Sequence, residues 1–340
     1  MQIFFGYRTA ELLLNQQRIE LLSPSFDQEL ERCCVNKSSI ESLATSYLYG
    51  LPRPYDVLVP TQSEFRRVSG VKCHLCRRDL PANSFINMGD NVFVASPQLC
   101  FVQRAAEYTL AQTVAFGARL CGTFALDKNQ PSGIRRRSPL ATLADLRTYV
   151  DSCPRMRGIV NARRALSLIP EGSASPMETI TQMVFCYPRR LRGLGLPTPQ
   201  MNYVEPISQV ARGMIDKDYI RIDLYWPDAA FGLEYQGDFA HSSNAKIASD
   251  ISRQLAAERM GIELQMLTIE QLRNESLKMM IARKIASRLG VSLDVDGRLL
   301  AENQRLIDEL IGMLPASHGH REDEMRSLAD AEPPSRVGCD

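Results

Sequence analysis

Strand-like and helix-like apolar patterns follow one another most clearly between residues 169 and 292. A helical run begins after Ser175, a residue that can cap a helix, with Pro176 at its first position and a glycine stop near residue 195. Three strand-like stretches, a helix closed by a glycine, a fourth strand and an amphipathic helix follow, at residues 199–205, 218–226, 231–236, about 245–260, 262–268 and 269–290. This order predicts an α/β core with a mixed sheet.

The pattern in residues 1–168 is less regular. Apolar residues at helical spacing begin at Ile40, and three short strand-like pieces (YDVLVP, VKCHLC and NVFVASP) precede a helix that starts near Pro97. Two more helices are predicted at about 140–153 and 158–168. Strands followed by a helical pair indicate a mainly helical α+β module. It could be winged-helix-like or another small type, and periodicity does not choose between them.

Shifts in composition mark the boundaries of these regions. The turn-rich segment IPEGSASP separates an N-terminal module, residues 1–168, from the α/β core, residues 169–292. A C-terminal helix is predicted at 293–314, and the low apolar content of residues 315–340 predicts a disordered tail. The length of 340 residues suits two domains.

The hairpin YIRIDLYWPDAAFGLEYQ, residues 219–236, carries two acids. If residues 227–230 form its loop, pairing places Asp223 opposite Glu234 and Arg221 opposite Gln236. Alternation along the first strand then places Arg221, Asp223 and Tyr225 on one face of the sheet. Two carboxylates about 5 Å apart repel each other unless a cation or a proton lies between them. Oxygen ligands of this kind suit Mg²⁺. The alternative is that this face is simply polar and solvated.

Composition bears on the class of protein, its binding to nucleic acid and its location in the cell. Hydrophobic content of 44% and charged content of 23% are those of a soluble globular protein, and a net charge of +1 means that binding to nucleic acid depends on local clustering. We expect no membrane association and a cytoplasmic location, because the sequence has neither a long apolar run nor a signal-peptide pattern and its nine cysteines are scattered. Cys73 and Cys76 have no second cysteine pair to complete a zinc site, so we interpret them as apolar strand residues.

The order and spacing of these features, over about residues 170–275, resemble the PD-(D/E)XK nuclease superfamily. The resemblance is closer to the endonuclease-like domains akin to very-short-patch-repair (Vsr) enzymes, which occur in many bacterial proteins. The matching residues are Ser175, Pro176, Glu178, Arg221, Asp223, Trp226, Pro227, Glu234, Gly237, His241, Asp250, Arg253 and Gly261. Upstream, SLATSYLYGLPRP and NVFVASPQLCFVQRAAEY are loosely similar to the N-terminal part of AbiEi-type antitoxins.

The resemblance implies a restriction-endonuclease-like fold, with Asp223 and Glu234 as ligands of Mg²⁺ or Mn²⁺. Gln236 occupies the position where the superfamily usually has lysine, and glutamine cannot act as a base, although it can orient a water molecule. By the same resemblance Glu178 could reach the metal, but Ser175-x-x-Glu178 is also a capping box. His241 could be a general acid or base, or an exposed loop residue.

Basic residues indicate a DNA partner. Between residues 133 and 192 eleven arginines stand against four acidic residues, an excess that suits phosphate binding. Asp250 and Arg253, one helical turn apart, are explained most simply as a surface ion pair, and Trp226 as a core residue. The favoured function is a Mg²⁺-dependent DNA endonuclease. The alternatives are an antitoxin-like DNA-binding regulator without catalysis and a protein-interaction scaffold. The candidate DNA-binding residues are Arg221, Arg253, Arg189, Arg190 and Arg192.

Overall fold

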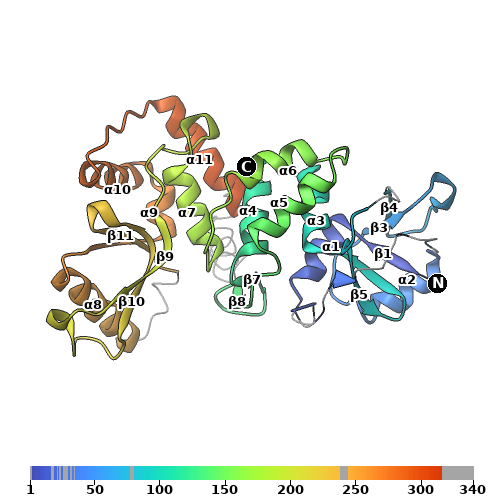
Figure 1. Cartoon of the computed structure of the whole chain (residues 1–340), viewed down its shortest axis with the longest axis horizontal. Coiled ribbons are helices and arrows are strands. Elements are labelled where there is room, and N and C mark those ends of the chain that lie inside the picture. Colours follow the sequence, from blue (N-terminus) through green and yellow to red (C-terminus); the bar gives the residue numbers. More distant parts are fainter. Residues whose placement is uncertain are drawn as a thin grey trace, which may run out of the picture.

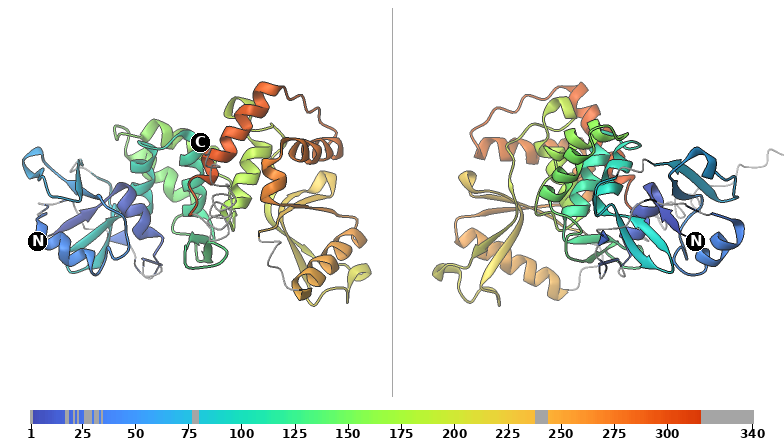
Figure 2. Two further views of the ribbon diagram at one scale, coloured as in Figure 1. Left: turned by 180° about the vertical axis from the view of Figure 1, so that it is seen from behind. Right: turned by 45° about the vertical axis from the view of Figure 1, so that its right-hand side comes forward.

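The computed structural model describes residues 2–315, except 17–18, 21, 23, 26–29, 31–32, 34, 77–79 and 238–243. His241 and the predicted tail therefore lie outside the described residues, apart from residue 315 itself. The molecule is elongated, with one sheet toward each end and a group of helices between them (Figure 1). Views from behind and from an oblique angle show the same arrangement (Figure 2). In the part of the chain that is described, no helix is both long enough and apolar enough to cross a membrane.

The N-terminal end holds a six-stranded mixed sheet. Its order is β2 (Pro24–Ser25), β5 (Phe85–Gly89), β6 (Val92–Ala95), β1 (Ile3–Phe5), β3 (Tyr55–Val59) and β4 (Val71–Leu75), accompanied by α1 (Tyr7–Leu14) and α2 (Lys37–Ala44). Sequence patterns correctly predict β3, β4 and β6. The very short β1 and β2 were not predicted, because two or three residues carry almost no periodicity. The five-residue strand β5 was missed as well.

The helices in the middle of the molecule are α3 (Pro97–Ala105), α4 (Leu110–Cys121), α5 (Leu143–Ser152) and α6 (Ile159–Leu166), beside a small hairpin of β7 (Phe124–Leu126) and β8 (Ile134–Arg136). The hydroxyl groups of Ser96, Thr109 and Thr142 cap the first three of these helices. Gly158 precedes α6 with φ of 92°, and a Cβ there would lie 2.4 Å from the Val102 carbonyl oxygen. Close packing of α6 against α3 therefore requires glycine at this position.

A buried ion cluster joins three of the helices. Glu11 of α1 accepts hydrogen bonds from Arg104 of α3 at 2.6 Å, from Tyr108 at 2.7 Å, and from Arg119 of α4. Burial alone would raise the pKa of Glu11, but the two arginines hold it below its ordinary value. The charge is thus fully compensated inside the protein.

The C-terminal helices and strands follow one another along the chain in the predicted order, and their sheet is mixed. Strands β9 (Gln200–Pro206), β10 (Tyr219–Trp226) and β11 (Phe231–Tyr235) are antiparallel neighbours, and β12 (Glu263–Leu267) pairs with β11 in parallel. α8 (Asn244–Arg259) connects β11 to β12, as such a crossover requires. The predicted final helix is divided into α9 (Ile269–Arg273) and α10 (Glu275–Arg288), because Asn274 caps the second.

One helix, α7 (Pro176–Cys186), is central to the molecule. Every residue from Glu178 to Cys186 is buried, so the helix is enclosed on all its faces. It packs against β10 and β11 of the C-terminal sheet, against α4, and against the C-terminal helix α11 (Gly297–Ile311). Trp226 is 2% exposed and donates its indole N–H to the Pro197 carbonyl, which confirms it as a core residue.

Candidate functional site

The β10–β11 hairpin has the predicted register. Leu224 pairs with Leu233 and Trp226 pairs with Phe231 around a short 3₁₀ turn, Pro227–Ala229. Continued by one step, this register places Asp223 opposite Glu234. The backbone ladder ends there, and the Asp223 carboxylate instead accepts a hydrogen bond from the Tyr235 N–H at 3.0 Å.

The predicted alternation of side chains along β10 is wrong at Asp223. The Tyr225 ring stacks on Tyr203 at 4.7 Å, and Tyr203 pairs with Ile222, so Ile222 and Tyr225 lie on the same face although they are three residues apart. On the neighbouring strand Asn202 has φ of 49°, a left-handed conformation that asparagine tolerates better than most residues. The side chains of β10 therefore change faces near Asp223, and Asp223 lies at the point of this change.

Asp223 is influenced by charges from helices on both faces. Burial first, and then the neighbouring carboxylate of Glu178 on α7, raise the pKa of Asp223 to about 7. The Tyr235 N–H and the guanidinium of Arg253 on α8 favour the charged form without cancelling this effect. At neutral pH this acid can therefore be neutralised by a proton or by another cation.

Glu234 is 3% exposed and has a raised pKa as well. Burial and the charge of Asp223 raise the pKa of Glu234 to about 8, although Arg253 opposes the shift. Arg253 donates directly to one oxygen of Glu234 and lies 3.9 Å from Asp250. Arg253 and Asp250 therefore lie within ion-pair distance, as predicted, and the arginine also reaches the carboxylate of Glu234.

Glu178 combines two roles that the sequence left open. The Ser175 hydroxyl caps α7 by accepting from the Glu178 N–H at 3.1 Å, and the Glu178 carboxylate accepts from Ala174 N–H at 2.8 Å, one residue before the position that a capping box uses. Asn202 also donates to this carboxylate. Burial raises the pKa of Glu178 despite these bonds. Glu178 is therefore both a capping residue and an acidic neighbour of Asp223.

The oxygen atoms at this site would fit a hard divalent cation. Among the described residues, Oε1 of Glu234 and Oδ1 of Asn202 are buried without a hydrogen-bond partner. Unpartnered oxygens beside two acids with raised pKa values match the donor type that Mg²⁺ prefers. Within the described ranges, however, no three His, Cys, Asp or Glu side chains are already arranged as a metal cluster. Arg253 and Asn202 hold two of the acids in their present positions.

The other residues predicted for the site lie at its border. Gln236 follows β11, and its side chain donates to Asp250 at 3.4 Å. Arg221 is exposed, and its charge partly opposes the rise in the pKa values of Glu178 and Asp223. His241 belongs to residues 238–243, outside the described residues. Asn202 was missed, although an asparagine within a strand-like run is a recognisable sign of irregular backbone.

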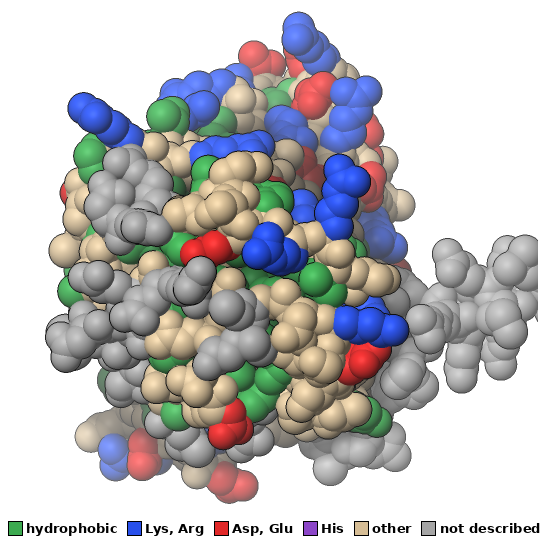
Figure 3. Space-filling view, turned by 90° about the vertical axis from the view of Figure 1, so that its right-hand side faces the viewer, with side chains coloured by type: hydrophobic (Ala, Val, Ile, Leu, Met, Phe, Trp, Pro, Cys, Tyr) green, Lys and Arg blue, Asp and Glu red, His purple; other side chains and the backbone are tan. Residues whose placement is uncertain are grey.

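The arginine cluster in the sequence does not form one surface. Arg137 is buried and donates to the Arg119 carbonyl, Arg135 pairs with Glu20, and Arg192 with Glu309 at 2.6 Å. At the N-terminal end of the molecule, Lys and Arg side chains gather mainly over the upper half of the face in Figure 3.

Arg189, Arg190 and Arg192 follow the C-terminal end of α7, whereas the acids lie by its N-terminal end. About eight helical steps of ~1.5 Å, or ~12 Å, separate Glu178 from the end of the helix. These arginines are therefore not part of the acid site, and they line a separate cavity together with Arg164, another of the eleven clustered arginines, and Arg298, which the sequence did not single out.

Comparisons of the chain with protein-family models, with curated proteins and with solved structures found no match.

Proposed function

We propose that this chain is a Mg²⁺-dependent endonuclease that hydrolyses phosphodiester bonds in DNA. The observation that carries the proposal is the pair of Asp223 and Glu234, which the hairpin register sets opposite each other at the end of the paired ladder and whose pKa values are raised to about 7 and 8. Acids buried in this way destabilise the folded protein in their charged form, and a cation that binds both would remove the penalty. The surrounding order of helices and strands supports the resemblance to the PD-(D/E)XK superfamily.

Asp223 and Glu234 would hold the metal, with Glu178 close enough to Asp223 to influence its charge. A bound Mg²⁺ would supply Lewis-acid polarisation of the phosphate and a water molecule of lowered pKa. Arg221 is exposed beside the acids and can orient a phosphate by charge and hydrogen bonding. The amide of Gln236, held toward Asp250, can orient a water molecule but cannot accept its proton as a base.

The contact between Arg253 and Glu234 favours a second candidate function. A guanidinium already contacts one of the two acids, and the position that is usually lysine carries glutamine. A DNA-binding regulator that keeps the fold without the chemistry would have this arrangement. It would bind DNA in a salt-dependent manner and would not cut it when Mg²⁺ is added.

The two candidates are separated by cleavage of supercoiled plasmid, measured with and without Mg²⁺. We would compare the wild type with Asp223→Asn and Glu234→Gln, which keep the shape of the site and remove its charge. Asp228→Asn is the matched control, because Asp228 is an exposed acid in the loop of the same hairpin. Nicking that needs Mg²⁺ and is lost only in the two site variants supports the nuclease. Equal cleavage by all four proteins, or none by any of them, refutes it.

A further inference from the structure

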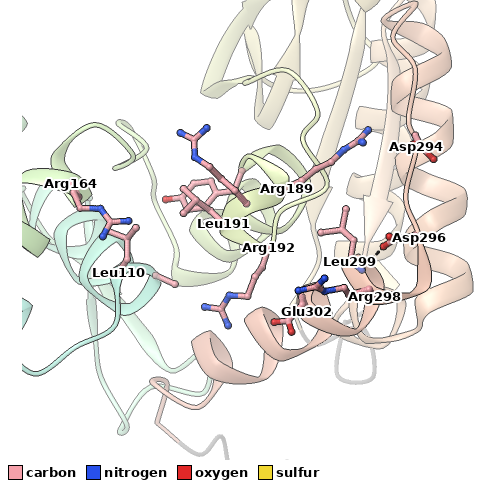
Figure 4. A pocket seen from close by; sticks show the side chains of 13 residues that line it. Leu110, Arg164, Arg189, Leu191, Arg192, Asp294, Asp296, Arg298, Leu299 and Glu302 are labelled. Atoms are coloured by element: carbon pink, nitrogen blue, oxygen red, sulfur yellow. Dashed lines mark hydrogen bonds between the residues drawn. The ribbon is translucent and has the colours of Figure 1, made fainter.

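A cavity of about 700 Å³ lies beyond the C-terminal end of α7. Its walls come from α4 and α6 on one side, from the 3₁₀ turn Arg189–Leu191 in the middle, and from α11 with the segment before it on the other (Figure 4). Segments far apart in the sequence thus enclose it. Five arginines line it: Arg164, Arg189, Arg190, Arg192 and Arg298.

The positive charge in this cavity exceeds the negative charge available to neutralise it. Three acids also line the cavity, and two of them are already engaged: Asp296 caps α11 by accepting from Leu299 N–H at 2.7 Å, and Glu302 pairs with Arg305. Arg192 is paired with Glu309. Within the part of the chain that the structure describes, the other four cavity arginines form no ion pair. They are free to bind an anion.

The turn that carries three of these arginines has a fixed shape. Arg192 has φ of 71°, a left-handed conformation that is unfavourable for a residue other than glycine. Its carbonyl is held by the buried Asn303 side chain at 2.8 Å, and that same side chain binds the Val184 carbonyl of α7. Gly193 packs so closely that a Cβ would lie 2.3 Å from the Tyr187 carbonyl oxygen. The strained turn is thus held on several sides, as expected where side chains are positioned for a ligand.

We propose that this cavity binds the sugar–phosphate backbone of single-stranded DNA without regard to base sequence. Arginine binds phosphate oxygens in bidentate geometry, which explains why all the cationic residues in the lining are arginines. Tyr187 is the only aromatic residue in the lining, and it is 4% exposed with its hydroxyl bonded to the Leu168 carbonyl, so it offers no platform for a base. Because the cavity is bordered by α4 with α6, by the turn and by α11, we take a flexible single strand as its ligand in preference to a stiff duplex.

This proposal rests on the proposed function only in taking DNA as the ligand. It assigns the cavity an anchoring role at a distance from the reaction. The ~12 Å of α7 between Glu178 and the end of the helix is a distance that a few nucleotides of one strand can span. Binding at both ends of α7 would hold the strand on either side of the bond to be cut.

The test is binding of a fluorescein-labelled oligothymidine by fluorescence anisotropy, in EDTA, over a range of salt concentrations. The protein is the full chain carrying Asp223→Asn, so that neither metal nor cleavage contributes. Arg189→Ala with Arg190→Ala removes two exposed cavity arginines, and Arg136→Ala with Arg147→Ala is the control for net charge, since both are exposed outside the cavity. Losing two phosphate contacts should reduce the slope of log affinity against log salt by about 1.4, since each contact contributes ~0.7. The control should keep the wild-type slope.

Three results would overturn the proposal. The first is a cavity variant that binds as tightly as the parent. The second is an equal loss of affinity in both double variants. The third is tighter binding of a duplex of the same length than of the single strand. Inorganic triphosphate serves as a further probe. If it binds and is lost in the cavity variant while oligothymidine binding is unchanged, the site takes a small anion instead. Because no metal is present, each of these results leaves the nuclease proposal to be judged separately by plasmid cleavage.

Discussion

Replacing Asp223 by asparagine tests the acid site through stability as well as through activity. The pKa of Asp223 is raised from 3.8 to about 7, so the folded protein binds this proton more tightly than the unfolded chain does. The stability that the folded protein gains by binding this proton is fully present below about pH 3.8 and is lost as the pH rises through about 7. A difference of about three pKa units corresponds to ~4 kcal/mol, and because Asp223 is only half-buried we expect about 2 kcal/mol.

Asparagine keeps the neutral shape and can still accept the bond from the Tyr235 N–H. We therefore expect the Asp223→Asn variant to match the wild type near pH 3.5 and to be about 2 kcal/mol more stable near pH 8.5, in the absence of metal. For a chain of this size that is a rise of several degrees in Tm, about 2–4 °C per kcal/mol. The measurement is thermal unfolding at both pH values, with Asp228→Asn as the control that should follow the wild type.

Addition of Mg²⁺ should reverse the ranking. A ligand that binds only the folded state stabilises it by RT ln(1 + [L]/Kd), which is about 2.7 kcal/mol at one hundred times the dissociation constant. The wild type should gain this stability near pH 8.5, and the variant should gain almost none. A variant that is less stable than the wild type near pH 8.5 would refute the assignment of a raised pKa to Asp223. An equal gain with Mg²⁺ in both proteins would refute the metal site.

Three other substitutions test the framework around the two sites. Glu11→Gln should destabilise the protein by about 3 kcal/mol, seen as a lower midpoint in urea at neutral pH, because two buried arginines lose their counter-charge. The loss should begin to shrink as the pH falls below 4.5, where the unfolded chain takes up a proton, and it should vanish below the lowered pKa of Glu11 in the folded protein, where the wild-type carboxylate is itself protonated. Gly232→Ala places a Cβ 2.7 Å from a side-chain carbon of β10 and should cost about 1–3 kcal/mol in thermal unfolding, whereas Gly237→Ala meets nothing closer than 3.8 Å and should be nearly neutral. Asn303→Ala frees the Arg192 carbonyl and should weaken binding of oligothymidine without changing the Mg²⁺ response; unchanged binding would show that the turn does not depend on this contact.

The hairpin register is the one expected if residues 227–230 form the loop, although a loop one residue longer or shorter would have changed the pairing. The orientation of Asp223 was not expected, because it depends on Asn202, a residue of another strand whose left-handed φ appears only after the strands have paired. The position of Arg253 likewise depends on how α8 rotates over the sheet. A helical pattern with weak amphipathicity leaves that rotation undetermined.

The buried cluster of Glu11 could have been suspected from the sequence. An acid in the middle of the apolar run YRTAELLL is unexpected on a buried helix face unless a cation pairs with it. The partners themselves, Arg104 and Arg119, lie more than ninety residues away, and nothing local identifies them. Nothing local in the sequence shows that Arg164 and Arg298 share a cavity either. They meet there only because α6 and α11 converge on the turn after α7.

The two proposed sites depend on one rigid element. α7 is buried along its length, and its N-terminal end is fixed by Ser175 and by the bonds of the Glu178 carboxylate. Its C-terminal end is fixed by Asn303, which joins the Val184 carbonyl of the helix to the Arg192 carbonyl of the turn. An enclosed helix cannot shift one end without disturbing the core around it. The distance between the acids and the arginines is therefore set by packing, so a strand held in the arginine cavity would meet the acids at a constant position along its backbone.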